Sequence, residues 1–438
     1  MIISIYNTGK YLDDTINSLI NQSIGFKEIH IILVNDGSTD NSEEICLKYQ
    51  KLYSNNIFYI KIKNSGVSKA RNIGLTFAKG KYINFLDSDD LWDYKAFEYV
   101  LSFFNSHNNI YFVSGRLKFF EARKNYHFLD YKFYKTRIIN ITEEYNCIQE
   151  SASTSFFLSS YIKDKKFKEG IKSGEDIRFV NEILLNNPLM GLIREAIYLC
   201  RRRLDSTSRT QTQINDIDFY FSSINNVGQY LIQLSMELYN IILPFIQYYI
   251  AYDILFRLES PSFNYLDSYD YKKYCELIDS ILKKIDDKYI LEQKNFINEY
   301  KILALSRKYN KDKRYDVYFN NGCLKYSDYT LIDLKNYKNI IIWKKIEIEN
   351  NILHLEGIDN LWIIKENYHY FCKLGNKTYY PQIFYHNSDD FITLYGTFEK
   401  GKIISFNIEL EENLTQFIYI YIFLFSILQW KYLLIQVI

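Results

Sequence analysis

The first ninety residues alternate short apolar runs with helix-like segments, and this alternation limits the possible folds more than any other feature. We expect strands over 2–5, 28–35, 57–62 and 82–86, with helices over 11–22, 41–53 and 69–78. Such alternation is typical of a parallel α/β sheet. Ligands of these sheets bind beyond the carboxyl ends of the strands, so the residues after each strand are the first candidates for a site.

Acidic residues follow two of the predicted strands and would therefore meet at one sheet edge. Asp36 follows the second strand, and Asp87 and Asp89 follow the fourth. A pair of carboxylates two residues apart suits Mg²⁺ or Mn²⁺, which binds one or two carboxylates together with substrate phosphates. The alternative is structural, since residues 88–90 could instead cap a helix that begins near Leu91.

The segment NDGSTD, residues 35–40, has a binding and a structural interpretation. A carboxylate at position 36 can accept the N3–H of uracil, a donor that cytosine lacks. An Asx turn that leads into a capped helix explains Gly37 to Asp40 without a ligand, and Asp40 with Glu43 has the spacing of a capping box. Asp36 is not needed for that cap, which favours a binding role for it.

Three further segments carry charges suited to catalysis or binding. In NSGVSKARNIGL, Arg71 lies one turn inside a helix whose first amides could hold an anion. In GEDIRF, Asp176 could take a proton from a hydroxyl, and the helix dipole favours its ionised form. In LCRRRLDSTS, the arginines 201–203 could bind phosphate oxygens. A solvated helix face, an acid stabilised by the dipole and a solvated basic loop are the respective alternatives.

Length and composition indicate a multidomain intracellular protein. The chain has 438 residues, which favours two or three domains. Its 53 basic and 52 acidic side chains give no overall field to attract nucleic acid. The six cysteines are dispersed without a CxxC pair, which argues against a zinc site and a disulfide scaffold and suits the reducing cytoplasm.

The pattern changes twice along the chain, and we place domain boundaries there. An α/β domain is expected over 1–212, a helical region over 213–312 with breaks at Pro244 and Pro261, and a β-rich module over 313–438. Within that module, Asn350 and Asn351 form a turn dipeptide between two alternating strands, which predicts a hairpin.

The two ends of the chain raise separate questions. The apolar segment 417–438 is just long enough to cross a bilayer, but its aromatic and β-branched residues equally suit a pair of sandwich strands. We expect a buried tail or one that associates peripherally with a membrane. Met1 has no secretory signal after it and begins inside the first strand. A start codon assigned too late or a shortened strand would explain this.

Taken in order, IISIYN, NDGSTDNS, NSGVSKARNIGL, FLDSDD, GED and RRRLDSTS resemble the GT-A glycosyltransferases of family 2. This large group includes capsule, lipopolysaccharide and teichoic acid sugar transferases. The resemblance covers about the first 208 residues and implies a Rossmann-like mixed sheet with a parallel core. Family members usually have Pro before the hydrophobic-Tyr-Asn of the first strand, where this chain has Ser4.

The resemblance also implies a role for each matching residue. Three residues match positions near the nucleotide base: Tyr6 matches the residue that packs on the base, Asp36 matches the one that bonds uracil, and Arg71 matches the basic residue near the base. Asp87 matches the acid that contacts the ribose, and Arg203 and Arg201 match the residues near the diphosphate. Asp89 matches the metal ligand, and Asp176 matches the general base.

The implied function is the inverting transfer of a sugar from a nucleotide-sugar, expected to be a UDP-sugar, to a hydroxyl of a glycan or lipid-linked acceptor. Mn²⁺ or Mg²⁺ would assist at the cytoplasmic face of the membrane. One rival is a sugar nucleotidyltransferase, but TGKYLDD has just Gly9 where a glycine-rich phosphate loop would stand. The other is a non-catalytic carbohydrate-binding protein, which has no need for Asp36, Asp89 and Asp176 together.

Overall fold

The computed structural model divides the chain into two compact units. It describes residues 1–208, 212–259, 266–311, 313–320, 323–333, 341–349, 352–359, 372–374, 377–379, 382–385 and 402–409. The first unit comprises Met1–Ala251 with Ser268–Tyr274, and the second comprises Tyr252–Asp267 with Cys275–Ile438.

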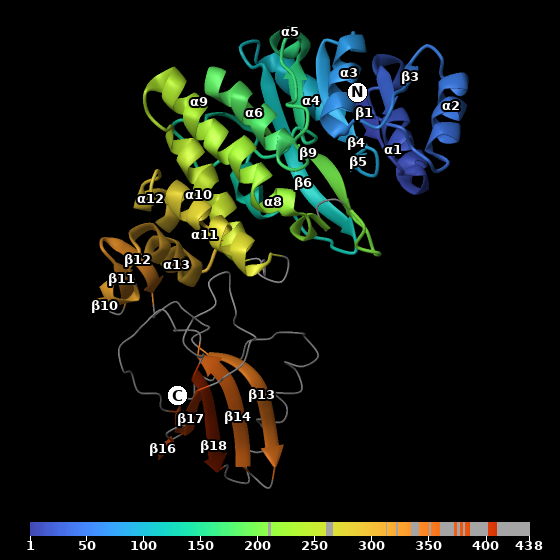
Figure 1. Cartoon of the computed structure of the whole chain (residues 1–438). Coiled ribbons are helices and arrows are strands. Elements are labelled where there is room, and N and C mark those ends of the chain that lie inside the picture. The colour runs from blue at the N-terminus through green and yellow to red at the C-terminus, as the bar shows by residue number, and fades with distance from the viewer. Residues whose placement is uncertain are drawn as a thin grey trace. The chain divides into compact units, whose positions relative to one another are not determined.

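A nine-stranded mixed sheet forms the centre of the first unit (Figure 1). Its strand order is β3-β2-β1-β4-β8-β6-β9-β5, with β7 paired to β9. The first four strands in this order are mutually parallel, whereas β8 is antiparallel to both β4 and β6. This arrangement confirms the predicted fold class, a mixed sheet with a parallel core.

The parallel half follows the predicted alternation with small shifts at the ends of elements. Its elements are β1 (Ile2–Ile5), α1 (Gly9–Ile20), the 3₁₀ helix η1 (Phe26–Glu28), β2 (Ile31–Asn35), α2 (Ser42–Leu52), β3 (Ile57–Lys61), α3 (Val67–Phe77) and β4 (Tyr82–Asp87). The alternating side chains of β1 and β2 are buried on both faces of the sheet, with Ile3 and Leu33 packed in the same cluster as α1 and α2. On the other face α3 packs against β1, and a Cβ on Gly74 would lie 2.3 Å from the Ile2 side chain. Burial on both faces explains why these strands read as continuous apolar runs.

The structure corrects the element expected after the acidic segment. A helix was predicted to begin near Leu91, but a short strand, β5 (Leu91–Trp92), forms there and α4 begins later (Ala96–Ser106). The two residues of β5 pair with Leu199 and Tyr198 of β9, and Trp92 is buried. Pairing with a distant strand therefore outweighs the local helix-start signal.

The antiparallel half contains β6 (Phe112–Glu121), the 3₁₀ helix η2 (Phe128–Phe133), β7 (Arg137–Asn140), β8 (Ser155–Leu158), α5 (Ser159–Ile162), α6 (Glu175–Asn186) and β9 (Leu189–Arg202). Strand β9 has 14 residues, and Arg201 and Arg202 belong to it rather than to a solvated basic loop. Strand β6 runs beside β9 as far as the pair Glu121 and Arg202.

The region after β9 is helical, as predicted. It contains η3 (Gln213–Asn215), α8 (Ile217–Tyr220), the π-helix η4 (Ile224–Gln229), α9 (Tyr230–Tyr239), α10 (Pro244–Glu259), α11 (Ser268–Leu282), α12 (Asp287–Leu291) and α13 (Asn298–Tyr309). Helix α10 begins at Pro244, the predicted break, whereas Pro261 lies outside the described residues. The boundaries at 212 and 312 stay predictions.

Between residues 317 and 409, the described part of the second unit consists mainly of short strands, where a β-rich module was predicted over 313–438. After η6 (Lys313–Asp316), one sheet contains the strands β10 (Val317–Asn320), β11 (Cys323–Tyr326) and β12 (Tyr329–Asp333). A second sheet contains, in spatial order, β13 (Ile341–Glu349), β14 (Ile352–Asp359), β18 (Lys402–Glu409) and β17 (Gln382–Tyr385). A third contains β15 (Cys372–Leu374) and β16 (Lys377–Tyr379). Strands β13 and β14 pair through Glu349 and Ile352, as the predicted hairpin requires.

The apolar tail, residues 417–438, lies outside the described residues. Among the helices in the part of the chain that the structure covers, none combines the length and apolar character that a bilayer crossing requires.

Gly191 of β9 offers a test of this packing. A Cβ there would lie 2.4 Å from the Phe103 ring of α4 and 2.9 Å from Val113 of β6. We expect Gly191→Ala to lower the free energy of unfolding of the first unit by about 1–3 kcal/mol, because the helix must move away from the sheet. Thermal and urea unfolding measure this.

Ser102→Ala, on the exposed face of the same helix, is the control and should change stability by less than about 0.5 kcal/mol. Equal stability of the two variants would contradict the close contact between α4 and β9.

Candidate functional site

The loops after β1 and β2 are bonded together at the carboxyl edge of the parallel strands. Asn7 has a left-handed backbone (φ 51°), and its side-chain oxygen accepts the Thr39 N–H at 2.8 Å. Asp40, predicted to cap α2, accepts the Ser42 N–H at 3.0 Å and also the Gly9 N–H at 2.9 Å. Tyr6 stands beside these loops with 51% of its surface exposed, so its ring is open to a ligand.

Asp36 holds the turn that begins α3. Its two carboxylate oxygens accept the backbone N–H groups of Ser65 (2.7 Å) and Gly66 (2.8 Å). Gly66 has φ 90°, a conformation that glycine adopts without strain, and it precedes the first residue of α3. The side chain predicted to bind uracil therefore also fixes the start of the helix that carries Arg71.

Arg71 lies among three carboxylates, and we call Arg71, Asp87, Glu175 and Asp176 the arginine–carboxylate cluster. The guanidinium donates to Asp87 at 2.9 Å, to Glu175 at 3.0 Å and to Asp176. It comes from α3, Asp87 ends β4, and the two other acids begin α6. The cluster therefore brings the predicted acidic strand end and the predicted base to one place.

The cluster has an uneven exposure to solvent. The side chain of Arg71 is 4% exposed, whereas those of Asp176 and Asp87 are 19% and 39% exposed. A ligand can therefore reach the two aspartates, but little of the arginine. The predicted contact of Arg71 with a nucleotide base stays a prediction.

Burial raises the pKa of Asp176 to about 7, against the opposing effect of Arg71. The negative charges of Glu175 and Asp87 act in the same direction as burial, and the Ala152 N–H, which donates to Asp176 at 3.2 Å, acts against it. The helix dipole was expected to favour the ionised form of this acid, but burial has the larger effect on its pKa and favours the protonated form.

The loop before β8 holds the same acids, and sequence analysis did not identify it. Ser153 donates its hydroxyl to Asp87 at 3.0 Å, and the neighbouring Ala152 N–H bonds Asp176. Glu175, which was not among the candidate residues, also binds Arg71. Its position next to Asp176 was the available signal, whereas no motif marks the serine.

Asp89 belongs to a second ion pair at this edge. Its Oδ2 accepts two bonds from Arg203, from Nε at 2.9 Å and from a terminal nitrogen at 2.6 Å. Arg201 donates to the backbone oxygen of Asp89 at 2.8 Å. The ring of Tyr11 lies 4.8 Å from both guanidinium groups. The predicted metal ligand and the predicted diphosphate residues are therefore direct neighbours.

Asp90 has a structural role rather than a capping one. Its carboxylate accepts the Tyr198 hydroxyl and the Arg201 N–H, both at 2.7 Å, and is buried. Burial and the nearby charges of Asp89 and Asp87 raise its pKa well above the usual value. Asp90 thus attaches the acidic segment to β9, and the third carboxylate of the motif is not available to a ligand.

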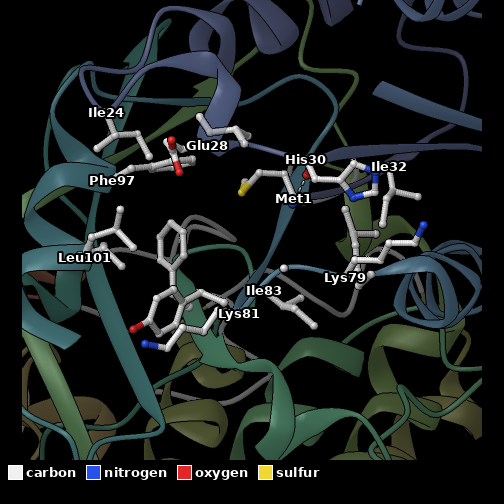
Figure 2. Close-up of a pocket in the computed structure, with 17 residues that line it drawn as sticks. Met1, Ile24, Glu28, His30, Ile32, Lys79, Lys81, Ile83, Phe97 and Leu101 are labelled. Carbon is white, nitrogen blue, oxygen red and sulfur yellow. Dashed lines mark hydrogen bonds between the residues drawn. The ribbon is translucent and has the colours of Figure 1, made fainter. Parts of the chain in front are cut away.

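A cavity of about 360 Å³ lies at the opposite edge of the sheet. Figure 2 shows Met1, His30 and Ile83 around it; Met1 and His30 directly precede β1 and β2, and Ile83 is the second residue of β4. The chemically active side chains follow the other ends of these strands, so this cavity is separate from the candidate site.

The candidate site contains two acids that a ligand can reach, Asp87 and Asp176, and two arginines that pair with acids, Arg71 and Arg203. Within the described residues no group of three or more His, Cys, Asp or Glu side chains is arranged to hold a metal by itself. Asp89 could therefore contribute one ligand to a cation that a phosphate also binds. Asp176 could accept a proton, and Arg203 could bind an anion in exchange for Asp89.

Comparisons with known proteins agree with this chemistry. Residues 1–164 match the family model described as "Glycosyl transferase family 2". The chain is 34% identical over 414 residues to the minor teichoic acid biosynthesis protein GgaB of Bacillus subtilis, covering 90% of this chain but 44% of GgaB. It is 35% identical over 303 residues to GgaA of the same organism, covering 67% of this chain and 68% of GgaA.

A solved structure shares the fold. The crystal structure of residues 1–349 of Staphylococcus aureus TarS in complex with UDP-GlcNAc matches with a TM-score of 0.55 at 19% identity. The match covers 75% of this chain and 97% of that one, so the GT-A fold implied by the motifs is confirmed. The similarity to GgaA extends over two thirds of both proteins, and with the family model it shows that this chain belongs to glycosyl transferase family 2.

Proposed function

We propose that this chain is an inverting glycosyltransferase that moves a sugar from a UDP-sugar to a hydroxyl of a cell-surface polymer or its lipid-linked precursor. The observation that carries the proposal is the convergence of Asp87, Asp89 and Asp176 at one sheet edge through Arg71 and Arg203. The family and the relatives named for teichoic acid biosynthesis support it.

Tyr6 and Asp36 would bind the uracil. Each oxygen of Asp36 accepts one backbone N–H, and a carboxylate has about four acceptor positions, so it can still accept the N3–H of uracil. The exposed ring of Tyr6 would stack on the base. Asp87, whose side chain is 39% exposed, would accept a ribose hydroxyl.

The diphosphate would separate the Asp89–Arg203 pair. Arg203 would turn to the phosphate oxygens, with Arg201 beside it, and Asp89 would then be free to hold Mn²⁺ or Mg²⁺. A single carboxylate plus phosphate oxygens fits the coordination preferred by such a cation. When bound, the cation would neutralise charge on the departing UDP.

Asp176 would act as the general base. It is 19% exposed, which leaves room for an acceptor hydroxyl, and the Ala152 N–H and Arg71 hold its carboxylate. The hydroxyl would lose its proton to Asp176 while its oxygen attacks the anomeric carbon from the side opposite the UDP. One displacement of this kind inverts the configuration at that carbon.

The relatives narrow the class of acceptor. One is named a poly(ribitol-phosphate) β-N-acetylglucosaminyltransferase and is 24% identical over 223 residues. A polyol-phosphate polymer is accordingly a suitable acceptor to test first, among lipopolysaccharide, capsule and teichoic acid precursors. Assembly of such polymers would place the enzyme in the cytoplasm at the inner membrane face, where residues 417–438 could associate peripherally.

The two rival functions fit the site less well. A sugar nucleotidyltransferase would need its phosphate loop after β1, where the Gly9 N–H is already bonded to Asp40. A non-catalytic carbohydrate-binding protein would give no reason for an acid at position 176 that is both buried and within reach of a ligand.

Nucleotide binding gives the first test. UDP at a hundred times its dissociation constant should stabilise the protein by about 2.7 kcal/mol, and Mn²⁺ should increase the thermal shift. CDP and GDP should give smaller shifts, because they do not present the same donor to Asp36. Asp89→Asn should remove the effect of Mn²⁺, measured by thermal unfolding with each nucleotide.

Asp93→Asn is the matched control, since the Asp93 carboxylate accepts the Lys95 N–H outside the cluster. A larger shift with GDP or CDP than with UDP would refute the uracil assignment of Asp36.

Arg203→Met should weaken UDP binding by more than tenfold while leaving uridine binding nearly unchanged, because uridine has no phosphate. Isothermal titration with both ligands measures the difference. Arg194→Met, at an exposed position of β9, the strand that ends one residue before Arg203, should change neither affinity. An equal loss for both ligands would contradict the phosphate role.

Asp176→Asn should bind UDP normally but lose about 10²–10⁴-fold in transfer rate, because amide cannot accept the proton. UDP release in the presence of acceptor measures the rate. Glu182→Gln, on the same helix and paired with Arg178, should keep its rate. Full turnover by Asp176→Asn would remove this residue as the base.

A further inference from the structure

Arg71 is an unusual feature of the candidate site because it is almost fully buried and touches every acid of its cluster. Its Nη1 donates to Glu175 and Asp176, and its Nη2 donates to Asp87. The ring of Phe167 lies 5.1 Å from the guanidinium carbon. A buried side chain with these partners has little surface left to contact a substrate.

We infer that Arg71 is the positioning residue of the general base: it orients the Asp176 carboxylate and keeps it ionised near neutral pH. This inference rests on the proposed function and assigns to Arg71 a role other than binding the nucleotide base. It also implies that Glu175, the other acid at the start of α6, opposes Arg71 in its effect on the base.

The charges around Asp176 explain why such a residue is needed. Arg71 from α3 faces it, together with Glu175 from its own helix, Asp87 from β4 and the Ala152 N–H from the loop before β8. Two of these neighbours are negative, and their charges raise the pKa of Asp176 as desolvation does. Both effects favour its protonated form. Arg71 is the cation among these neighbours, and an opposite charge at this distance lowers a carboxyl pKa by about 1–3 pH units.

Arg71 itself stays charged under these conditions. Burial would lower its pKa, but the carboxylates of Asp176, Asp87 and Glu175 outweigh burial and raise it. The arginine thus remains a fixed positive charge while Asp176 titrates. A lysine at this position would keep the charge but could not bond all three acids with the same planar geometry.

The test is the pH dependence of transfer for four single variants of the full chain. In the wild type, the rate should rise with pH, reach half its maximum near pH 7 and level off about one pH unit higher, because the base must be ionised. Arg71→Met should move this rise to higher pH by about 1–3 pH units. Its transfer rate should therefore be lower than that of the wild type by tenfold or more below pH 6 and recover at high pH. Arg71→Lys should recover part of the wild-type profile.

Glu175→Gln should move the rise in the opposite direction, to lower pH, because it removes a negative charge beside the base. Lys69→Met is the control on the same helix, since Lys69 is 43% exposed and pairs with Glu169 instead of the cluster. Its profile should match the wild type. The pH profile would then move to higher pH in Arg71→Met and to lower pH in Glu175→Gln. Loss of packing alone would not move the two profiles in opposite directions.

A second measurement does not depend on activity. An acid whose pKa is raised in the folded state contributes stability at low pH and loses it as pH rises through the folded pKa. The unfolding temperature of the wild type minus that of Asp176→Asn should therefore fall from about pH 4, near the ordinary carboxyl pKa, to about pH 7, the folded pKa. In a Glu175→Gln background, the same difference should stop falling at lower pH, and in an Arg71→Met background it should continue to fall to higher pH.

The two measurements separate failure of the inference from failure of the proposed function. Absence of transfer with a normal stability difference would refute the function but support the role of Arg71. Unchanged pH profiles in Arg71→Met and Glu175→Gln, with transfer intact, would overturn the inference. If Arg71→Met does not fold, the pH profiles of Arg71→Lys and Glu175→Gln still test the inference, because both variants keep a positive charge at position 71.

Discussion

The ion pairs of Arg71 hold the candidate site together. A buried guanidinium is stable only when carboxylates surround it, and three acids in one small region are tolerated only because a cation lies between them. The four members come from α3, β4 and the start of α6, which are distant in sequence. Their mutual attraction therefore fixes the position of the proposed base relative to the end of β4 that carries Asp87.

The position of Arg71 depends in turn on Asp36. The Asp36 carboxylate accepts the two backbone N–H groups that precede α3, and Gly37 approaches Asn64 so closely that a Cβ would lie 2.8 Å from its backbone nitrogen. These contacts set where the helix begins, and Arg71 follows one turn later. One residue could thus bind the nucleotide and also place the arginine that acts on the base.

A second group of contacts ties the acidic segment to the far side of the sheet. Asp90 accepts bonds from Tyr198 and Arg201 of β9, while Asp89 pairs with Arg203 just beyond that strand. The arginines therefore reach the acids because β9 is long and runs beside β6 up to the site. The Asp89–Arg203 pair keeps both charges compensated until a phosphate and a cation could replace it.

The sequence alone determined the order of strands and helices in the first half, because continuous apolar runs and strong turn residues leave few alternatives. It also selected Asp36, Asp87, Asp89 and Asp176 as candidate site residues, since acids after buried strands and at a helix start form readable motifs, and their roles stay predictions. It could not show that Asp90 is structural, that Leu91 begins a strand, or that Ser153 and Glu175 join the cluster. These outcomes depend on pairing with β9 and on contacts between residues more than sixty positions apart. Only the tertiary structure sets such contacts, because burial and Coulomb attraction act through space and leave no local pattern in the chain.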